Sequence, residues 1–179
     1  MSTRKGIKII KLDGSRIQEL LSNFTSLYSC GDFSDIINQN LFYVLEGKFK
    51  QVYMFKKNNF LEELLLKLSD LDFFPYSIGI PILKEYNNSY FKPTLTFGSL
   101  IKDICSNKIT IDRNKAELIT FKKPVIINNL FDFNNAIVLD DRKDFVAFAI
   151  LKPIKLNKIG NATEVIPTLD IGWYLREGG

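Results

Sequence analysis

The pattern of apolar residues changes near residue 106, and this change constrains the fold more than any other feature of the sequence. Before it, apolar residues recur at spacings of three and four over residues 15–30 and 60–68, which predicts two amphipathic helices. Two β-rich runs around Glu46-Gly47-Lys48 lie between them and predict a hairpin. After residue 107, short apolar runs alternate with turn residues, as in small β-barrels. We therefore expect an α+β fold with two domains, residues 1–105 and residues 106–179.

Further elements are predicted within these domains. The second helix is expected to begin at Asn58 or Asn59 and to bury its apolar residues, Phe60, Leu61, Leu64, Leu65 and Leu68. A buried strand over residues 76–83 turns at Asn87-Asn88 into an edge strand, because Pro93 cannot donate a backbone hydrogen bond. The remaining predicted segments are a helix over 97–105, strands over 108–111, 124–127, 136–139, 144–151 and about 164–167, helical turns over 113–120, and a final helix over 169–176 capped by Asp170.

Histidine is absent from the chain, and this excludes the catalytic pairs and triads that use imidazole as their base. The two cysteines, Cys30 and Cys105, are too few for the familiar zinc sites. Because disulfides are rare in cytoplasmic proteins, we interpret both cysteines as reduced thiols that fill space in the core. Acidic pairs such as Asp140-Asp141 lie at predicted turns or on helices, and no glycine-rich phosphate loop occurs. The sequence therefore predicts no catalytic residue, no metal site and no cofactor.

Overall charge and hydropathy are compatible with a protein that binds nucleic acid. No apolar run approaches the roughly 20 residues that span a bilayer, and Met1–Lys5 leads into no signal-peptide core, so we expect a cytoplasmic protein without a membrane partner. The formal net charge is +4 and the isoelectric point is near 8.9. Residues 108–179 hold 11 Lys/Arg against nine Asp/Glu, which leaves an excess of only +2 in each half of the chain. Any RNA affinity is therefore expected to be modest.

Three lysines at a spacing of three, Lys152, Lys155 and Lys158, follow the strand predicted to end at Leu151. Pro153 is expected to keep this stretch irregular, and three ammonium groups on one extended segment can follow the phosphates of an RNA strand. A solvated loop in a lysine-rich protein is the alternative interpretation.

Other cationic and aromatic residues are candidates for the same interface. Lys122-Lys123 precedes Pro124 and presents two more charges, or forms an exposed turn. Arg176 joins the patch or complements a helix dipole. Trp173 and Tyr174 stack on unpaired bases or, as we favour, anchor the terminal helix to the barrel.

A series of short segments is spread over nearly the whole chain: Phe42–Tyr53, Pro75–Gly79, Lys108–Ile111 with Ala116-Glu117, Val146–Ala149 and Asp170–Arg176. In this order the segments together resemble the Nip-seven family of biogenesis factors for the large ribosomal subunit, and the hairpin turn resembles archaeal members. The resemblance implies an N-terminal antiparallel sheet with flanking helices, followed by a C-terminal PUA-type β pseudobarrel that contacts RNA.

This resemblance also implies a function. Family members are non-catalytic RNA-binding adaptors in pre-rRNA processing, so we expect RNA and other ribosome-assembly proteins as partners of a monomeric chain. The RNA is expected to be single-stranded and uridine-rich, and Lys152, Lys155 and Lys158 occupy the basic stretch of archaeal relatives. PUA domains place glycines near the strand at 124–127, where this chain has Lys122-Lys123-Pro124 and Asn128-Asn129, and this departure argues against close backbone contact with RNA there. The alternatives are a protein-interaction scaffold of the pre-ribosome with little RNA affinity and, less favoured, an RNA-modifying enzyme.

Overall fold

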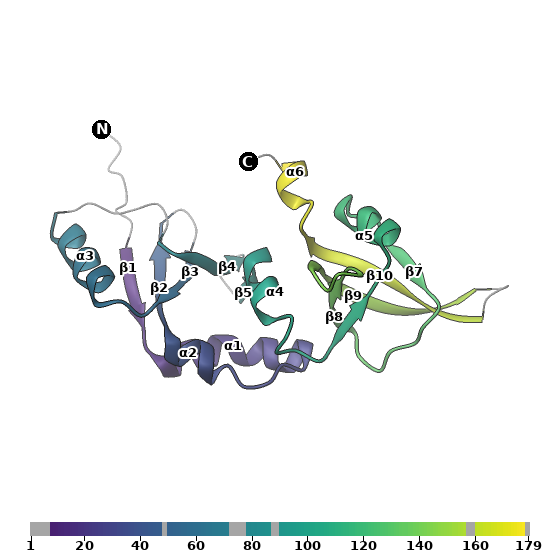
Figure 1. The fold of residues 1–179 in the computed structure, drawn as a ribbon, viewed down its shortest axis with the longest axis horizontal. Helices are drawn as coiled ribbons and strands as arrows, with labels where there is room; N and C mark the ends of the chain where they lie inside the picture. The colour runs from purple at the N-terminus through teal and green to yellow at the C-terminus, as the bar shows by residue number, and fades with distance from the viewer. Residues whose placement is uncertain (1–7, 48–49, 72–77, 87–89, 157–159, 178–179) are drawn as a thin grey trace. The chain divides into compact units, whose positions relative to one another are not determined.

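Two five-stranded sheets and six helices make up the computed structural model, which describes residues 8–47, 50–71, 78–86, 90–156 and 160–177 (Figure 1). The mixed α+β class predicted from the sequence is confirmed. The chain divides into two compact units, Met1–Ser22 with Asp32–Phe97 and Asn23–Gly31 with Gly98–Gly179. Each unit is built around one of the two sheets.

The first sheet is an antiparallel meander in which each strand pairs with the next along the chain. Its strands are β1 (Lys8–Leu12), β2 (Asn40–Glu46), β3 (Lys50–Lys56), β4 (Ile80–Tyr86) and β5 (Tyr90–Pro93). The predicted hairpin is β2–β3, and Pro93 lies on an edge strand as expected. The turn predicted at Asn87-Asn88 lies outside the described residues.

Four helices begin in the first unit: α1 (Gly14–Tyr28), α2 (Ser34–Gln39), α3 (Asn59–Asp70) and α4 (Leu95–Ile101). Helix α3 begins where predicted, because the Asn58 side chain accepts a hydrogen bond from the Phe60 backbone N–H at 2.9 Å. Leu65 packs against Leu41 and Tyr43 of β2. The expectation that Phe60 and Leu64 are buried is wrong, since their exposed fractions are 68% and 38%.

This error has a geometric reason. At about 100° per residue, Leu65 lies about 140° around the helix from Phe60 and about 100° from Leu64. Only the side of α3 that carries Leu65 faces the sheet. Glu62 of α3 also contacts the sheet, through a hydrogen-bonded ion pair with Lys11 of β1. That hydrogen bond raises the pKa of Lys11 above its usual value.

The second sheet is curled into a half-barrel in the order β6-β8-β9-β10-β7. Its strands are β6 (Lys108–Thr110), β7 (Val125–Ile127), β8 (Asn135–Leu139), β9 (Phe145–Leu156) and β10 (Gly160–Asp170). Strand β6 pairs with β8 in parallel, and the other pairs are antiparallel. Helix α5 (Arg113–Thr120) contributes Ala116 and Ile119 to the core beneath these strands, and α6 (Trp173–Glu177) ends the described chain. Asp112 caps α5 by accepting the Lys115 backbone N–H at 2.9 Å.

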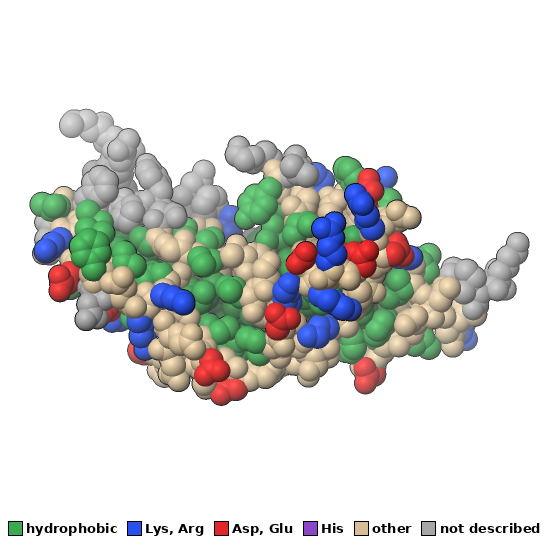
Figure 2. Space-filling view, in the orientation of Figure 1, with side chains coloured by type: hydrophobic (Ala, Val, Ile, Leu, Met, Phe, Trp, Pro, Cys, Tyr) green, Lys and Arg blue, Asp and Glu red, His purple; other side chains and the backbone are tan. Residues whose placement is uncertain are grey.

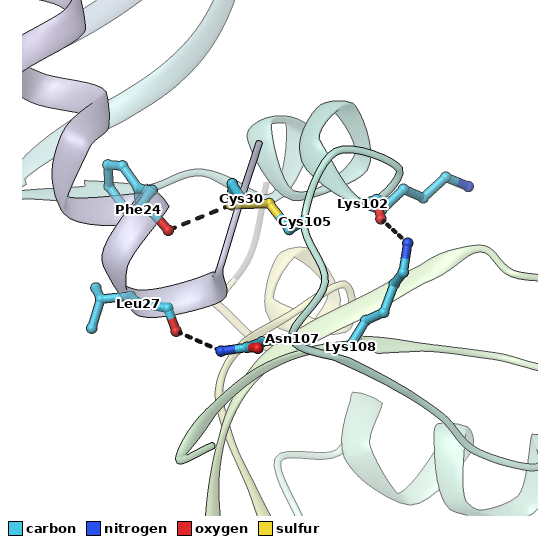
Figure 3. Close-up of a disulfide and its surroundings, with 7 residues drawn as sticks. All are labelled: Phe24, Leu27, Cys30, Lys102, Cys105, Asn107 and Lys108. Atoms are coloured by element: carbon cyan, nitrogen blue, oxygen red, sulfur yellow. Dashed lines mark hydrogen bonds between the residues drawn. A yellow bond between two sulfur atoms is a disulfide. The ribbon is translucent and has the colours of Figure 1, made fainter. Parts of the chain in front are cut away.

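The cysteines form a disulfide, so their interpretation as reduced thiols is wrong (Figure 3). Cys30 follows α1, Cys105 follows α4, and the two are paired as an antiparallel bridge inside the second unit. Backbone hydrogen bonds from Gly31 N to Ile104 O and from Ser106 N to Ser29 O, both 3.0 Å, hold the two segments together. The prediction failed because it took the oxidation state from an assumed compartment, whereas the tertiary fold places the two residues side by side.

The end of α1 is also part of the core of the second unit. The buried ring of Tyr28 lies 5.1 Å from that of Phe148 on β9, measured between ring centroids, and burial raises the pKa of Tyr28 to about 12. Asn107 donates from its side chain to the Leu27 carbonyl at 3.4 Å (Figure 3). Residues 23–31 therefore complete the core beside the second sheet.

Candidate nucleic-acid interface

Strands β9 and β10 are much longer than predicted and continue together past the end of β8, with β7 paired to β10 along residues 163–165 (Figure 1). We use "the ribbon" for residues 151–156 and 160–165. Pairing runs without a register shift from Leu156↔Gly160 to Ile150↔Ile166. Among the described residues, β8 pairs with β9 only as far as Ile150. Pro153 is tolerated because this part of β9 is an edge, so the expected irregular stretch is instead a regular strand.

This regular pairing separates the predicted lysines. Side chains of a strand alternate between its two faces, so a spacing of three places Lys152 and Lys155 on opposite faces of the ribbon. Both side chains are exposed, and they lie about 10 Å apart along the strand at about 3.3 Å per residue. Lys158 lies outside the described residues. The ribbon therefore presents lysines to both sides rather than in a single row.

The two faces of the ribbon differ in chemistry. Lys152 is in register with Glu164 of β10, which in turn is in register with Ile126 of β7. Ile126 and Ile150 on this face are 44% and 40% exposed. Lys155 is in register with Asn161, and both side chains are exposed. The carboxylate beside Lys152 reduces the local positive charge, so the Lys155 face is the more cationic of the two.

Lys122 and Lys123 form the C-terminal cap of α5. Lys122 has φ of 62° and donates its N–H to the Ile119 carbonyl at 2.8 Å, while Lys123 N–H donates to the Leu118 carbonyl at 3.1 Å. This is the Schellman arrangement, in which the left-handed position is usually glycine. Both lysine side chains are exposed just before β7, so they remain available to a ligand.

Replacing Lys122 with glycine is expected to raise the free energy of unfolding by about 1 kcal/mol, because a residue with a Cβ is disfavoured in the left-handed region. Lys123→Gly is the matched control: it removes the same side chain from a residue outside that region, and we expect it to leave stability unchanged or lower it. Urea unfolding of the two variants checks the prediction, and equal stabilities would contradict it.

Arg176 is engaged within the protein. Its guanidinium forms two hydrogen bonds with the carboxylate of Asp170, at 2.8 and 3.0 Å, and also donates to the Thr120 carbonyl. Asp170 is 2% exposed and also accepts the Gly172 N–H at 2.9 Å. Because Asp170 ends β10 and Gly172 precedes α6, this bond stabilises the turn before the helix, and the prediction that Asp170 caps the helix is wrong. A Cβ on Gly172 would lie 1.9 Å from the Thr120 carbonyl oxygen, so only glycine permits this approach.

Trp173 and Tyr174 are exposed, at 40% and 55%, and meet edge to face at 5.3 Å between ring centroids. Neither ring belongs to the buried core, so the anchoring role stays a prediction. The contacts of Arg176 with Asp170 and Thr120 tie this helix to the unit.

Asp140 serves local structure. Asp140 accepts hydrogen bonds from the N–H groups of Arg142 and Asp144 in the predicted turn. The described part of the chain holds no group of three His, Cys, Asp or Glu residues positioned for a metal ion. Within the same residues, no helix is both long and apolar enough to cross a bilayer.

Charge is mixed over the surface of the second unit. On the face shown in Figure 2, lysine and arginine side chains are interspersed with acidic ones rather than gathered in one patch. The best-defined candidate interface for nucleic acid therefore consists of the ribbon, its neighbour Ile126 and the α5 cap. No model of a known protein family matches the chain, and no curated protein matches its sequence.

Proposed function

We propose that the protein is a non-catalytic RNA-binding adaptor in large ribosomal subunit biogenesis, with a PUA-type second unit that binds single-stranded, uridine-rich pre-rRNA. The observation that carries the proposal is the ribbon, a regularly paired extension of β9 and β10 past β8 with exposed lysines on both faces. The order of the segments that resemble the Nip-seven family supports the ribosomal context. The curled half-barrel is compatible with a PUA pseudobarrel.

A ribbon with cations on both faces favours a ligand that bends around it. A flat nucleic-acid surface reaches one face of a strand, whereas a flexible single strand can contact Lys152 and Lys155 at once. Phosphate contacts of this kind position the RNA without reading its sequence. The small net charge of this half predicts weak binding, and each phosphate contact is expected to add to the salt dependence of that binding.

Replacing Lys152 or Lys155 with alanine is expected to reduce the slope of log affinity against log salt concentration by about 0.7–1 for each lysine. Fluorescence anisotropy with a labelled oligouridylate between 50 and 200 mM salt, roughly the range over which such contacts weaken, measures the slope. Lys57→Ala is the matched control, since Lys57 is also exposed but belongs to the first unit. Unchanged slopes in both ribbon variants would refute the assignment of the ribbon, and an effect of only one would show that RNA lies on a single face.

A second candidate function, a protein-interaction scaffold of the pre-ribosome, is favoured by α3. Phe60 and Leu64 lie one turn apart on α3, Leu71 directly follows the helix, and the three are 68%, 38% and 75% exposed. Such exposed apolar side chains are typical of a surface that docks a partner protein. Failure of the intact chain to bind RNA, together with retention of ribosome-assembly proteins that is lost in Phe60→Ser/Leu64→Ser, would establish the scaffold in place of the adaptor.

A further inference from the structure

Strands β4 and β5 of the first unit form an antiparallel hairpin that carries two exposed lysines and two exposed tyrosines on one face. Its register pairs Lys84 with Lys92 and Tyr86 with Tyr90. Because alternate residues of a strand share a face, these four side chains lie on the same side. We call this set the hairpin face.

The two rings and one ammonium group of the hairpin face are in direct contact. Tyr86 and Tyr90 lie 5.8 Å apart between centroids, and the Lys92 Nζ lies 3.7 Å from the centroid of Tyr86 and 5.6 Å from that of Tyr90. The tyrosines remain 47% and 49% exposed. About half of each tyrosine is therefore accessible, beside a cation that holds the pair together.

The hairpin face also concentrates positive charge. Lys84 and Lys92 lie directly opposite each other on neighbouring strands, and the Lys92 ammonium lies over the Tyr86 ring. The two rings and the two lysines therefore form one cationic, aromatic surface.

The only carboxylate that the described contacts place on this side of the sheet is Glu62 of α3, which is ion-paired with Lys11 of β1. Lys84 is in register with Gln51 of β3, whose side-chain oxygen accepts a hydrogen bond from the Tyr53 hydroxyl at 2.7 Å. Glu85 is in register with Phe91 and so lies on the opposite face. The row of paired residues that crosses the sheet through Lys84 contains no carboxylate: Ile9, Leu45, Gln51, Lys84 and Lys92. An anionic ligand therefore meets no carboxylate along this row.

We propose that the hairpin face is a second contact surface for single-stranded RNA, on which bases stack on Tyr86 and Tyr90 while Lys84 and Lys92 pair with phosphates. Exposed aromatic rings on adjacent strands with cations beside them are the usual platform for unpaired bases. The inference rests on the proposed RNA-binding function and extends it to the first unit. An acidic protein segment would use the lysines but has no bases to stack.

The test compares the binding of a labelled 12-nucleotide oligouridylate with that of an abasic sugar-phosphate chain of equal length, using the full-length protein. Tyr86→Ala/Tyr90→Ala is expected to weaken oligouridylate binding by at least about tenfold and to leave binding of the abasic chain unchanged. Tyr86→Phe/Tyr90→Phe keeps both rings and is expected to bind as the wild type does. Lys84→Gln/Lys92→Gln is expected to reduce the salt slope by about 1.4.

Each result has a defined meaning, with circular dichroism and thermal melting as the check that each variant is folded. Wild-type binding by the Tyr→Ala variant overturns the inference, as does a loss in the Tyr→Phe variant equal to that in the Tyr→Ala variant. If the Tyr→Ala and Lys→Gln variants bind RNA as the wild type does but no longer bind an acidic protein partner, the hairpin face is a protein-binding surface and the inference is overturned.

Measuring Lys152→Ala/Lys155→Ala in parallel separates the two proposals. A loss in that variant alone supports the ribbon and overturns the hairpin face. A loss in the tyrosine variant alone does the reverse, and no RNA binding by the wild type overturns both.

Discussion

Reduction of the Cys30–Cys105 disulfide is expected to lower the free energy of unfolding by about 4 kcal/mol. The bond joins residues 75 positions apart, and closing a loop of that length removes a large share of the conformational entropy of the unfolded chain. Both cysteines are buried, at 7% and 1% exposure. The reduced thiols therefore stay in the core of the native state, and their hydration does not offset the loss of stability. A decrease of this size corresponds to a melting temperature lower by roughly 10 °C.

Two measurements test the disulfide and its effect. Alkylation of the unfolded protein without reductant, followed by mass spectrometry, should show no modified cysteine, and two modified cysteines after reduction. Thermal unfolding of Cys30→Ser/Cys105→Ser should match that of the reduced wild type and should not respond to reductant. Free thiols before reduction, or a melting temperature that reductant leaves unchanged, would contradict the expectation.

The Arg176→Met substitution is expected to lower the free energy of unfolding by about 3 kcal/mol. It leaves the carboxylate of Asp170, which is 2% exposed, without its bidentate partner, and an uncompensated buried charge is strongly destabilising. Methionine keeps the apolar stem of the side chain, so little packing is lost. The arginine is one-quarter exposed, which places the expected effect at the low end for buried pairs.

A double-mutant cycle with Asp170→Asn isolates the pair. The combined variant should lose less stability than the sum of the two single variants, because the unpaired charge is no longer present. Chemical denaturation of the four proteins gives the interaction energy directly. Additive losses of stability would show that the interaction between Arg176 and Asp170 contributes nothing. If Arg176→Met keeps the stability of the wild type but reduces the slope of log RNA affinity against log salt concentration, Arg176 is an RNA contact instead.

Local sequence patterns were sufficient to predict most elements. The apolar spacing of α1, the β-rich runs of β2–β3 and the Asn58 cap of α3 depend on residues a few positions apart. Pro93 predicted an edge strand because proline has no backbone N–H to donate to a neighbouring strand, whatever the fold around it. The same local chemistry marked Lys152 and Lys155 as exposed cations.

Tertiary structure determined where these residues point and with what they pair. Regular pairing with β10 placed Lys152 and Lys155 on opposite faces, and the register of β4 with β5 gathered Tyr86, Tyr90 and two lysines on one face. Cys30 meets Cys105 across 75 positions, and Arg176 meets Thr120 across 56. Such contacts depend on chain closure over many residues, which no local pattern encodes. The sequence by itself determined the fold class and the exposed cations, whereas pairing register and long-range contacts decided which of them share a surface.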